Sequence, residues 1–302
     1  MDIRNKITTN QKAFTLVEIL VVIAVIGLLS SIIFAITRGA NEQGRIAKGL
    51  YFSQHLHNSL GSYAAGIWSF DEGTGVTAND ISGWGNNGTL VNAPTWRCAS
   101  ADLSYTPSGQ GCSLEFDGAD DYVDAGSGTN LTMTNAFTYE AWFKANDVTT
   151  YRVFLALGVG GGVVNTGDVR VSAGKVNAYW HGSGGVYGGK LGSTTLTTGT
   201  WYHVVVVVVS GQYPVIYLNG VSEGTTIGTA QTFAGTGWKA WIGKTLYADA
   251  AKPFSGLIDE VRIYATALTS TQIESQYYAG LNKLLAKGQI TEQEYRQRLA
   301  KT

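Results

Sequence analysis

One carboxylate in this 302-residue chain lies where it needs a cationic partner. Glu18 is near the start of the stretch Phe14–Ile36, which is 23 residues long and otherwise almost entirely apolar. Inside a membrane-spanning helix an ionised carboxylate is costly unless a partner neutralises it, and such residues are rare and usually functional. We therefore expect Glu18 to form an ion pair that matters for function.

The two cysteines, Cys98 and Cys112, are 14 positions apart in one loop-like stretch. A metal site would need further ligands nearby, and the sequence contains no cluster of cysteine and histidine. Outside the cytoplasm a disulfide is the usual state of such a pair. We predict a Cys98–Cys112 disulfide that closes a loop of about 15 residues and contributes about 3 kcal/mol in the chain-entropy model.

The apolar stretch Phe14–Ile36 is the element that must position Glu18. A helix that rises about 1.5 Å per residue would span about 35 Å over this stretch, which is enough to cross the hydrocarbon core of a bilayer. Before it lies a short leader with three cations, which are Arg4, Lys6 and Lys12. Cations next to an apolar span favour a cytoplasmic location for that end. We expect the N-terminus to stay inside and residues 37–302 to lie outside.

Residues Lys12–Glu18, with the sequence KAFTLVE, resemble the processing site of type IV prepilins. In that family a prepilin peptidase cuts the chain on the cytoplasmic side, before the phenylalanine, and the new amino group is methylated. The resemblance implies cleavage between Ala13 and Phe14 and N-methylation of Phe14. It also implies that Glu18 pairs with the Phe14 ammonium of a neighbouring pilin subunit. A head-to-tail contact of that kind builds an open filament.

An ordinary signal peptide or signal anchor is the alternative explanation of this N-terminus. A cleaved signal peptide has an apolar core of about 7–15 residues followed by small residues at the cleavage site. Here the apolar run is longer and carries an acid, which favours the prepilin interpretation. Ala13 replaces the glycine that the family usually has before the cut, and Ala35 stands where many pilins have a helix-kinking proline.

Composition and periodicity favour a β-rich extracellular module after the helix. The chain has 39 glycines, 16 tyrosines and 8 tryptophans, and its net charge of −1 argues against nucleic-acid binding, which requires a basic face. From Gly66 onwards, apolar and polar residues alternate between turns, as in an antiparallel sandwich. Val204–Val209 is apolar on both faces and predicts a central strand covered on each side. Asn219 and Gly220 predict a tight hairpin.

Several segments resemble the laminin-G-like, concanavalin-type jelly-roll family. The matching segments are Trp68–Gly73, Ser82–Leu90, Leu114–Val123, Tyr217–Gly220 and Gly256–Tyr264. The resemblance implies a jelly roll over residues 66–267. We therefore predict a mainly β fold, in which a long N-terminal α-helix carries an antiparallel β-sandwich head. The function stays open, because this fold hosts lectins, inert spacers and glycosidase accessory modules alike.

Modules of this family often bind Ca²⁺ at an edge of the sandwich through hard oxygen ligands. The acidic residues beside glycines in the matching segments are Asp71, Asp117, Asp120, Asp121 and Asp259. The resemblance makes them candidate calcium ligands, with Asp259 and Asp71 as the first choices. The alternative is that they accept hydrogen bonds in turns, as aspartate does near glycine.

A glycan site would need an aromatic platform with polar neighbours. Tyr179 and Trp180, which precede a glycine-rich loop, are the best candidates for ligand binding, and Trp84 and Trp238 are others. The alternative is that these side chains belong to the core, as most aromatic residues of a sandwich do.

The sequence offers little for catalysis, and we predict that the protein is not an enzyme. Glycosidases on a related jelly roll place two carboxylates around one bond. Asp259 and Glu260 are adjacent in a predicted strand and would face opposite sides. Asp120 and Asp121 lie in a loop without a matching third acid. The sequence contains no nucleophile elbow, HExxH motif or P-loop.

Helical signals return after Leu268. The pairs Thr269–Gln272 and Thr291–Glu294 have the spacing of capping boxes. Residues 268–302 therefore predict a short C-terminal helical hairpin. It could pack on the sandwich, extend into solvent or mediate oligomerisation.

Together these features predict a type IV pilin-like subunit with four segments. These are a leader (1–13), a transmembrane and assembly helix (14–62), the jelly-roll head (66–267) and the helical tail (268–302). The expected partners are prepilin peptidase, other pilin subunits, the membrane and glycans, and calcium is the candidate cofactor. The subunit would reside in the inner membrane before assembly and in an extracellular filament afterwards. The alternatives are a type II secretion pseudopilin and an unassembled, membrane-tethered lectin.

Overall fold

The computed structural model describes residues 16–17, 19–30, 60–133, 135–159, 166–182, 186–246, 252–286, 288 and 290–300. The predicted processing site at Ala13 and Phe14, and the predicted assembly residue Glu18, lie outside these residues. The chain divides into two compact units, Met1–Lys48 and Gly49–Thr302, and each is described by itself below.

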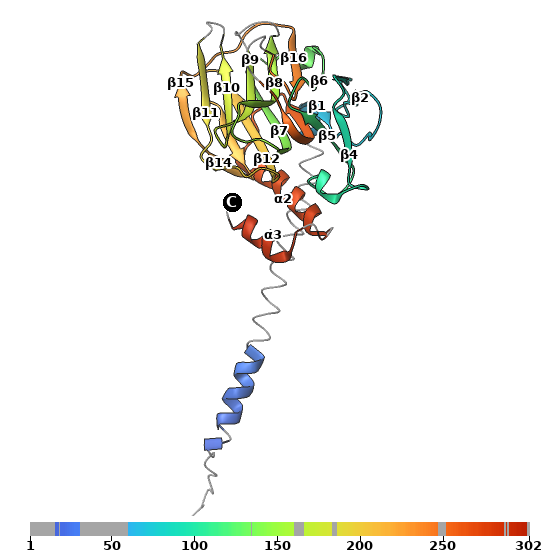
Figure 1. The fold of residues 1–302 in the computed structure, drawn as a ribbon. Coiled ribbons are helices and arrows are strands. Elements are labelled where there is room, and N and C mark those ends of the chain that lie inside the picture. Colours follow the sequence, from blue (N-terminus) through green and yellow to red (C-terminus); the bar gives the residue numbers. More distant parts are fainter. Residues whose placement is uncertain are drawn as a thin grey trace, which may run out of the picture. The chain divides into compact units, whose positions relative to one another are not determined.

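The first unit contains a helix, of which residues 16–17 and 19–30 are described (Figure 1). Apart from Ser30 its described side chains are apolar, all are exposed, and the exposed fractions of the large apolar ones run from 48% for Val25 to 81% for Leu16. Within the described part of the chain, no helix combines the length and the hydropathy that crossing a membrane would require.

The second unit contains two sheets, and the first of them has eight strands. These strands are β1 (Ala64–Trp68), β4 (Thr95–Cys98), β5 (Cys112–Asp117), β7 (Ala136–Ala145), β12 (Trp201–Val209), β13 (Val215–Leu218), β14 (Val221–Glu223) and β18 (Ser255–Tyr264). Their order is β14-β13-β12-β7-β18-β5-β4, and β1 also pairs with β18. All of these pairs are antiparallel.

The second sheet has ten strands. These are β2 (Thr77–Ala78), β3 (Gly88–Val91), β6 (Tyr122–Asp124), β8 (Arg152–Val159), β9 (Thr166–Ser172), β10 (Lys175–His181), β11 (Tyr187–Leu191), β15 (Thr225–Gly228), β16 (Trp238–Ile242) and β17 (Lys252–Pro253). Their order is β15-β11-β10-β9-β8-β16-β6-β3-β2, and the short β17 pairs with β8 in parallel. Three 3-10 turns, η1 (Gly61–Tyr63), η2 (Leu103–Tyr105) and η3 (Thr129–Leu131), complete the connections.

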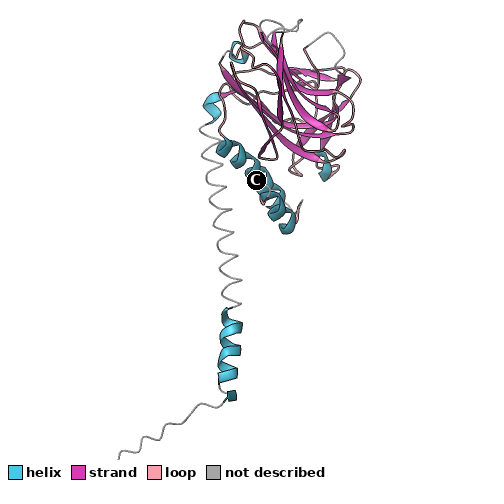
Figure 2. Ribbon diagram, turned by 90° about the vertical axis from the view of Figure 1, so that its left-hand side faces the viewer, coloured by secondary structure: helices cyan, strands magenta, loops and turns pink. Residues whose placement is uncertain are grey.

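The two sheets face each other and enclose the main core, as Figures 1 and 2 show. Aromatic rings fill much of this space: the Phe137 ring centroid lies 5.2 Å from that of Trp180 and 5.9 Å from that of Trp238. Each such ring removes about 150–250 Å² of surface from water, so a few of them dominate the energy of the core. The predicted mainly β fold with an antiparallel sandwich is confirmed.

Strand β12 is buried on both sides, as its run of valines predicts. Val204, Val206 and Val208 belong to the core between the sheets. Val205 and Val207 belong to a second apolar cluster on the other side of the eight-stranded sheet. That cluster also contains Leu268 and Ile273, and Ile273 comes from helix α2 (Ser270–Ala286). The C-terminal helix therefore covers a face that would otherwise expose valines to water.

A buried carboxylate lies on the same side of the eight-stranded sheet. Glu140 of β7 is 1% exposed. Its Oε1 accepts a hydrogen bond from Arg262 Nη1 at 2.8 Å and lies 3.0 Å from His203 Nε2, and the Tyr264 hydroxyl donates to Oε2 over 3.3 Å. Burial raises the pKa of Glu140, but Arg262 and His203 outweigh it and hold the pKa below its ordinary value.

The tail forms the predicted helical hairpin of α2 and α3 (Glu292–Leu299), seen below the sandwich in Figure 2. Thr291 and Glu294 form a complete capping box at the start of α3. The Tyr295 hydroxyl donates to Asn282 Oδ1 over 2.7 Å and so joins α3 to α2. Because the joined atoms are buried, the hairpin has a small interior of its own.

Candidate functional site

Strands β9 and β10 place polar and aromatic side chains on the outer face of the ten-stranded sheet. Side chains alternate between the two faces along a strand. Those that point into the core are Val169, Val171, Val176, Ala178 and Trp180. Those between them, Asp168, Arg170, Tyr179 and His181, therefore point outward. We call this side of the sheet the outer face.

The strand register arranges the outer face in rows. Tyr179 is opposite Asp168, Asp168 is opposite Ala156 of β8, and Ala156 is opposite Trp241 of β16. The next row contains Tyr187, His181, Thr166, Gly158 and Lys239. Neighbouring strands are about 4.8 Å apart, so each row brings together side chains that are distant in sequence.

A buried ion pair between two tyrosine rings lies at the centre of this face. We call Tyr151, Asp168, Arg170 and Tyr179 the arginine–tyrosine cluster. Arg170 Nε donates to Asp168 Oδ1 over 2.5 Å. The guanidinium carbon lies 3.7 Å from the centroid of the Tyr179 ring and 4.2 Å from that of Tyr151. Both distances are well inside the range of a cation–π interaction.

The Asp168–Arg170 ion pair is buried, and its burial shifts the pKa values of the cluster. The exposed fraction is 0% for Asp168 and 9% for Arg170. Burial raises the pKa of Asp168, and the charge of Arg170 opposes that rise. Burial also raises the pKa of Tyr151, whose hydroxyl donates to Asp168 Oδ2 over 3.4 Å. The guanidinium is thus held by a carboxylate through Nε and by an aromatic ring on each side.

Further aromatic rings flank the cluster. Tyr187 is 49% exposed, and its ring centroid lies 6.3 Å from that of Tyr179 and 6.1 Å from that of His181. On the other side of the face, the Tyr122 ring lies 5.0 Å from Trp241. Flat apolar rings beside hydrogen-bond donors are the chemistry that a sugar-binding surface requires, because a sugar ring has both apolar C–H faces and polar hydroxyls.

The predicted ligand-binding pair of Tyr179 and Trp180 is split between the two sides of the sheet. Tyr179 lies on the outer face, in the arginine–tyrosine cluster. Trp180 is 1% exposed and packs against Phe137 and Phe233 in the core, so it cannot reach a ligand in this fold. Trp238 is fully buried as well. Alternation along β10 explains the split, since neighbouring residues of a strand face opposite sides.

Three of the candidate calcium ligands come together at one end of β5. The carboxylate oxygens of Asp117, Asp120 and Asp121 lie within 4.8 Å of one another. Asp121 is 4% exposed, and its Oδ2 accepts the backbone N–H of Asp117 over 3.0 Å. Its Oδ1 is buried and has no hydrogen-bond partner within the described structure. Burial raises the pKa of Asp121, and the charges of Asp117 and Asp120 raise it further.

A hard cation fits this set of oxygens. An orphaned buried carboxylate oxygen beside two exposed carboxylates is a costly arrangement that a bound cation would relieve. Oxygen ligands of this kind suit Ca²⁺. The exposed Asp117 and Asp120 would supply further oxygens from the same turn.

The other two candidate calcium ligands, Asp71 and Asp259, lie outside this cluster and already have hydrogen bonds. Asp71 Oδ1 accepts the N–H of Cys112 over 3.0 Å, and Asp259 Oδ1 accepts that of Glu260 over 2.7 Å. Burial raises the pKa of Asp259, and the charges of Glu260 and Asp71 raise it further. A β-bulge follows Asp259, and Glu260 has a φ of +51° there, which a simple alternating strand does not predict.

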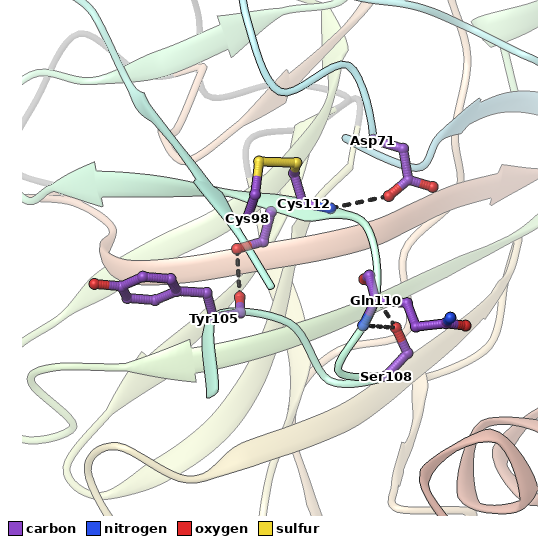
Figure 3. The surroundings of a disulfide bond; sticks show 7 residues. Asp71, Cys98, Tyr105, Ser108, Gln110 and Cys112 are labelled. Carbon is purple, nitrogen blue, oxygen red and sulfur yellow. Dashed lines mark hydrogen bonds between the residues drawn. A yellow bond between two sulfur atoms is a disulfide. The ribbon is translucent and has the colours of Figure 1, made fainter. Parts of the chain in front are cut away.

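The predicted disulfide joins two neighbouring strands. Cys98 of β4 and Cys112 of β5 are directly opposite each other in the register and are bonded (Figure 3). The figure also shows the hydrogen bond from the N–H of Cys112 to Asp71. The disulfide thus lies next to the turn that follows β1, and it closes the loop that contains η2.

Asp168, Arg170 and Tyr151 are the members of the arginine–tyrosine cluster that the sequence interpretation missed. The signal for Arg170 was present, because Asp168-Val169-Arg170-Val171 alternates polar and apolar residues and so places both charges on one side of a strand. Tyr151 carries no comparable signal. It lies just before β8, and the fold alone brings its ring against Arg170.

Sequence comparison finds two matches within the chain. The profile of the concanavalin A-like lectin/glucanases superfamily matches residues 117–274, which is just over half of the chain. The prokaryotic N-terminal methylation motif matches residues 8–34. No curated protein sequence matches the chain significantly.

Several solved structures share the fold. Domain 4 of AbnA, a GH43 extracellular arabinanase from Geobacillus stearothermophilus, solved with arabinotriose, aligns with a TM-score of 0.51 and 20% identity over 70% of this chain and 96% of that one. The binding domain of Paraclostridial Mosquitocidal Protein 1 aligns with a TM-score of 0.56 and 12% identity, over 74% of this chain and 53% of that one. A mutant Trypanosoma rangeli sialidase with trans-sialidase activity aligns with a TM-score of 0.52 and 13% identity, over 79% of this chain and 38% of that one. At such identities the likeness shows the fold alone.

Proposed function

The chain belongs to the concanavalin A-like lectin/glucanases superfamily and carries a prokaryotic N-terminal methylation motif, and we propose that it is a type IV pilin-like structural subunit with a glycan-binding head. The observation that carries this proposal is the presence of both matches on one chain. The methylation motif is consistent with processing and assembly into a filament, and the sandwich would be the domain that the filament exposes.

The N-terminal helix supports the assembly part of the proposal. Its described side chains, in residues 16–17 and 19–30, are exposed, and all but Ser30 are apolar. Such a surface needs lipid or a neighbouring helix to cover it. We propose that prepilin peptidase cuts between Ala13 and Phe14 and that Glu18 then pairs with the Phe14 ammonium of the next subunit. The pair would fix the axial register of the filament.

The outer face supports the glycan-binding part of the proposal. Tyr179 and the exposed Tyr187 offer ring faces, and Arg170 offers hydrogen-bond donors beside them. The related domain 4 of AbnA was solved with arabinotriose, which is consistent with a sugar as ligand for a sandwich of this kind. We propose binding rather than catalysis, because the buried acid of this face, Asp168, is already committed to Arg170.

We further propose that Asp117, Asp120 and Asp121 hold a calcium ion. The support is the buried Asp121 Oδ1, which has no partner within the described residues. When bound, the ion would neutralise the three carboxylates and stabilise the turn between β5 and β6. Its role in this proposal is structural.

N-terminal mass analysis of the mature protein, combined with Glu18→Ala, tests the assembly proposal. The wild-type protein should begin with a methylated Phe14. The E18A protein should still be inserted and cleaved but should fail to enter filaments, because the partner of the neighbouring ammonium is gone. Ser30→Ala, which removes a hydroxyl from the same helix, is the matched control and should assemble normally.

A mature protein that keeps its first thirteen residues would refute the processing step. Normal assembly of the E18A protein would refute the ion pair and would favour a membrane-tethered lectin. Filaments that stay beneath the cell surface, as seen by labelling of intact cells, would favour a type II secretion pseudopilin over a pilus.

A further inference from the structure

We propose that the outer face selects glycans that carry a carboxylate or a sulfate and that Arg170 is the residue that recognises the anionic group. This inference rests on the proposed glycan-binding function and adds the chemical class of the ligand. It also assigns Arg170 as the residue that determines specificity.

The first argument is that the guanidinium has unused donors. Within the described structure Arg170 makes one hydrogen bond, from Nε to Asp168 Oδ1. Neither Nη group has an acceptor among the described residues, and neither is among their buried polar atoms that lack a partner, so both reach solvent. The Nη edge of a guanidinium matches two oxygens of a carboxylate or a sulfate in a bidentate geometry.

The second argument is that the guanidinium is oriented before any ligand arrives. The fully buried Asp168 holds Nε, and the rings of Tyr151 and Tyr179 lie 4.2 and 3.7 Å from the guanidinium carbon. A free arginine would lose side-chain entropy on binding an anion, whereas this one has already lost it in folding. Preorganisation of this kind is what a specificity residue needs.

The third argument is the charge around the cluster. Asp168 is neutralised by Arg170, and the exposed Lys239 lies in the neighbouring row. Lys244 Nζ lies 4.8 Å from the Tyr122 ring centroid on the same side of the sheet. Asp124 belongs to the same strand as Tyr122, so its charge offsets that of Lys244, and Lys239 leaves an excess of positive charge among these described side chains. An anionic sugar would therefore meet net positive charge.

The fourth argument is the platform beside the arginine. The Tyr179 ring contacts the guanidinium with a centroid distance of 3.7 Å, and Tyr187 continues the aromatic surface with a centroid separation of 6.3 Å. A sugar ring stacked on these tyrosines would place a ring substituent next to the Nη edge. A small inorganic anion would use the arginine alone and leave the aromatic surface unused.

The experiment measures binding of three oligosaccharides of equal length to the full chain in detergent micelles by calorimetry. They are an oligogalacturonate, which carries carboxylates, a sulfated galactan, and a neutral galactan. We expect at least one of the two anionic glycans to bind about tenfold tighter than the neutral one, since hydrogen bonds to charged groups are the stronger ones. Comparison of the two anionic arms distinguishes carboxylate from sulfate.

The variants are chosen so that a folding defect does not decide the outcome. Arg170→Gln would leave Asp168 buried without its counter-ion, so the double variant Asp168→Asn with Arg170→Gln is measured as well. Either variant should lose about tenfold in affinity for the anionic glycan and keep its affinity for the neutral one. Arg170→Lys keeps the charge without the bidentate edge and should lose part of the selectivity. Lys283→Gln, an exposed lysine on α2, is the matched control and should bind normally.

Three results would overturn the inference. Equal affinity of the wild-type protein for neutral and anionic glycans would remove the selectivity while leaving the glycan-binding proposal intact. Full selectivity in the double variant would remove Arg170 from the site. Absence of binding to all three glycans would refute this inference and, with a wider neutral panel also negative, the proposed glycan-binding function.

Discussion

Replacing Glu140 by glutamine should destabilise the head severely. The side chain is 1% exposed and is bound to Arg262, His203 and Tyr264. The substitution keeps the shape but removes the charge, so the buried side of Arg262 loses its counter-ion. Removing one partner of a buried ion pair costs about 3–5 kcal/mol. Arg262 keeps a second partner in Glu260, which places the expected loss near the lower end, at about 3 kcal/mol.

Urea unfolding followed by tryptophan fluorescence measures this loss, and Trp142 is a suitable reporter because its ring lies 5.0 Å from that of His203. Glu292→Gln is the matched control. Glu292 forms an ion pair with Arg296 at 2.8 Å, but their side chains are 58% and 60% exposed. Exposed pairs of this kind contribute less than about 1 kcal/mol. Both variants make the same chemical change, so the difference between them reports burial.

The pH dependence provides a second readout. The pKa of Glu140 is lowered in the folded protein, so its contribution is fully present above its ordinary value of 4.5 and is lost as the pH falls through the folded-state pKa. The difference between wild type and E140Q should therefore be largest near neutral pH and should shrink below pH 4.5. A loss no greater than that of E292Q, or a difference that does not change with pH, would refute the reasoning.

Two other predictions concern the disulfide and the calcium site. Cys98→Ser with Cys112→Ser should lower the free energy of unfolding by about 3 kcal/mol in urea titrations, because the cross-link no longer restricts the unfolded chain, and a loss below about 1 kcal/mol would contradict this. Calcium at about 100 times its dissociation constant should stabilise the head by about 2.7 kcal/mol and raise the melting temperature by roughly 5–10 °C at pH 7. Because the pKa of Asp121 is raised, the free energy of unfolding of the metal-free protein falls as the pH rises above 3.8. Calcium binds the ionised carboxylate, so the calcium effect should vanish below that pH. Asp120→Asn should reduce the calcium shift and Glu292→Gln should not.

The sequence predicts well the features that depend on local patterns. Val204–Val209 is apolar at every position, which requires cover on both faces, and the structure provides it from the core and from α2. Asn219 and Gly220 have φ values of +52° and +81°, which the predicted tight turn requires. The capping box at Thr291 follows from residue spacing alone.

Features that depend on strand register are not predictable in the same way. Tyr179 and Trp180 are both aromatic, and the sequence of β10 does not state which face is the core. Register with β9 decides it, and it sends Trp180 inward. The acidic residues pose the same problem. The turn after β5 gathers Asp117, Asp120 and Asp121, whereas the hydrogen bonds of Asp71 depend on strands that are distant in sequence.

The place of α2 after all the strands in the sequence affects how the protein can be made. Every strand of the sandwich emerges from the ribosome before α2 does, so the valine-lined side of β12 stays exposed until α2 has been made. A nascent or truncated chain would present Val205 and Val207 to other chains, and such exposed β-prone surface promotes aggregation. Helix α2 is therefore required to cover this apolar side of β12, and a chain that stops before α2 should aggregate more readily than one that contains it.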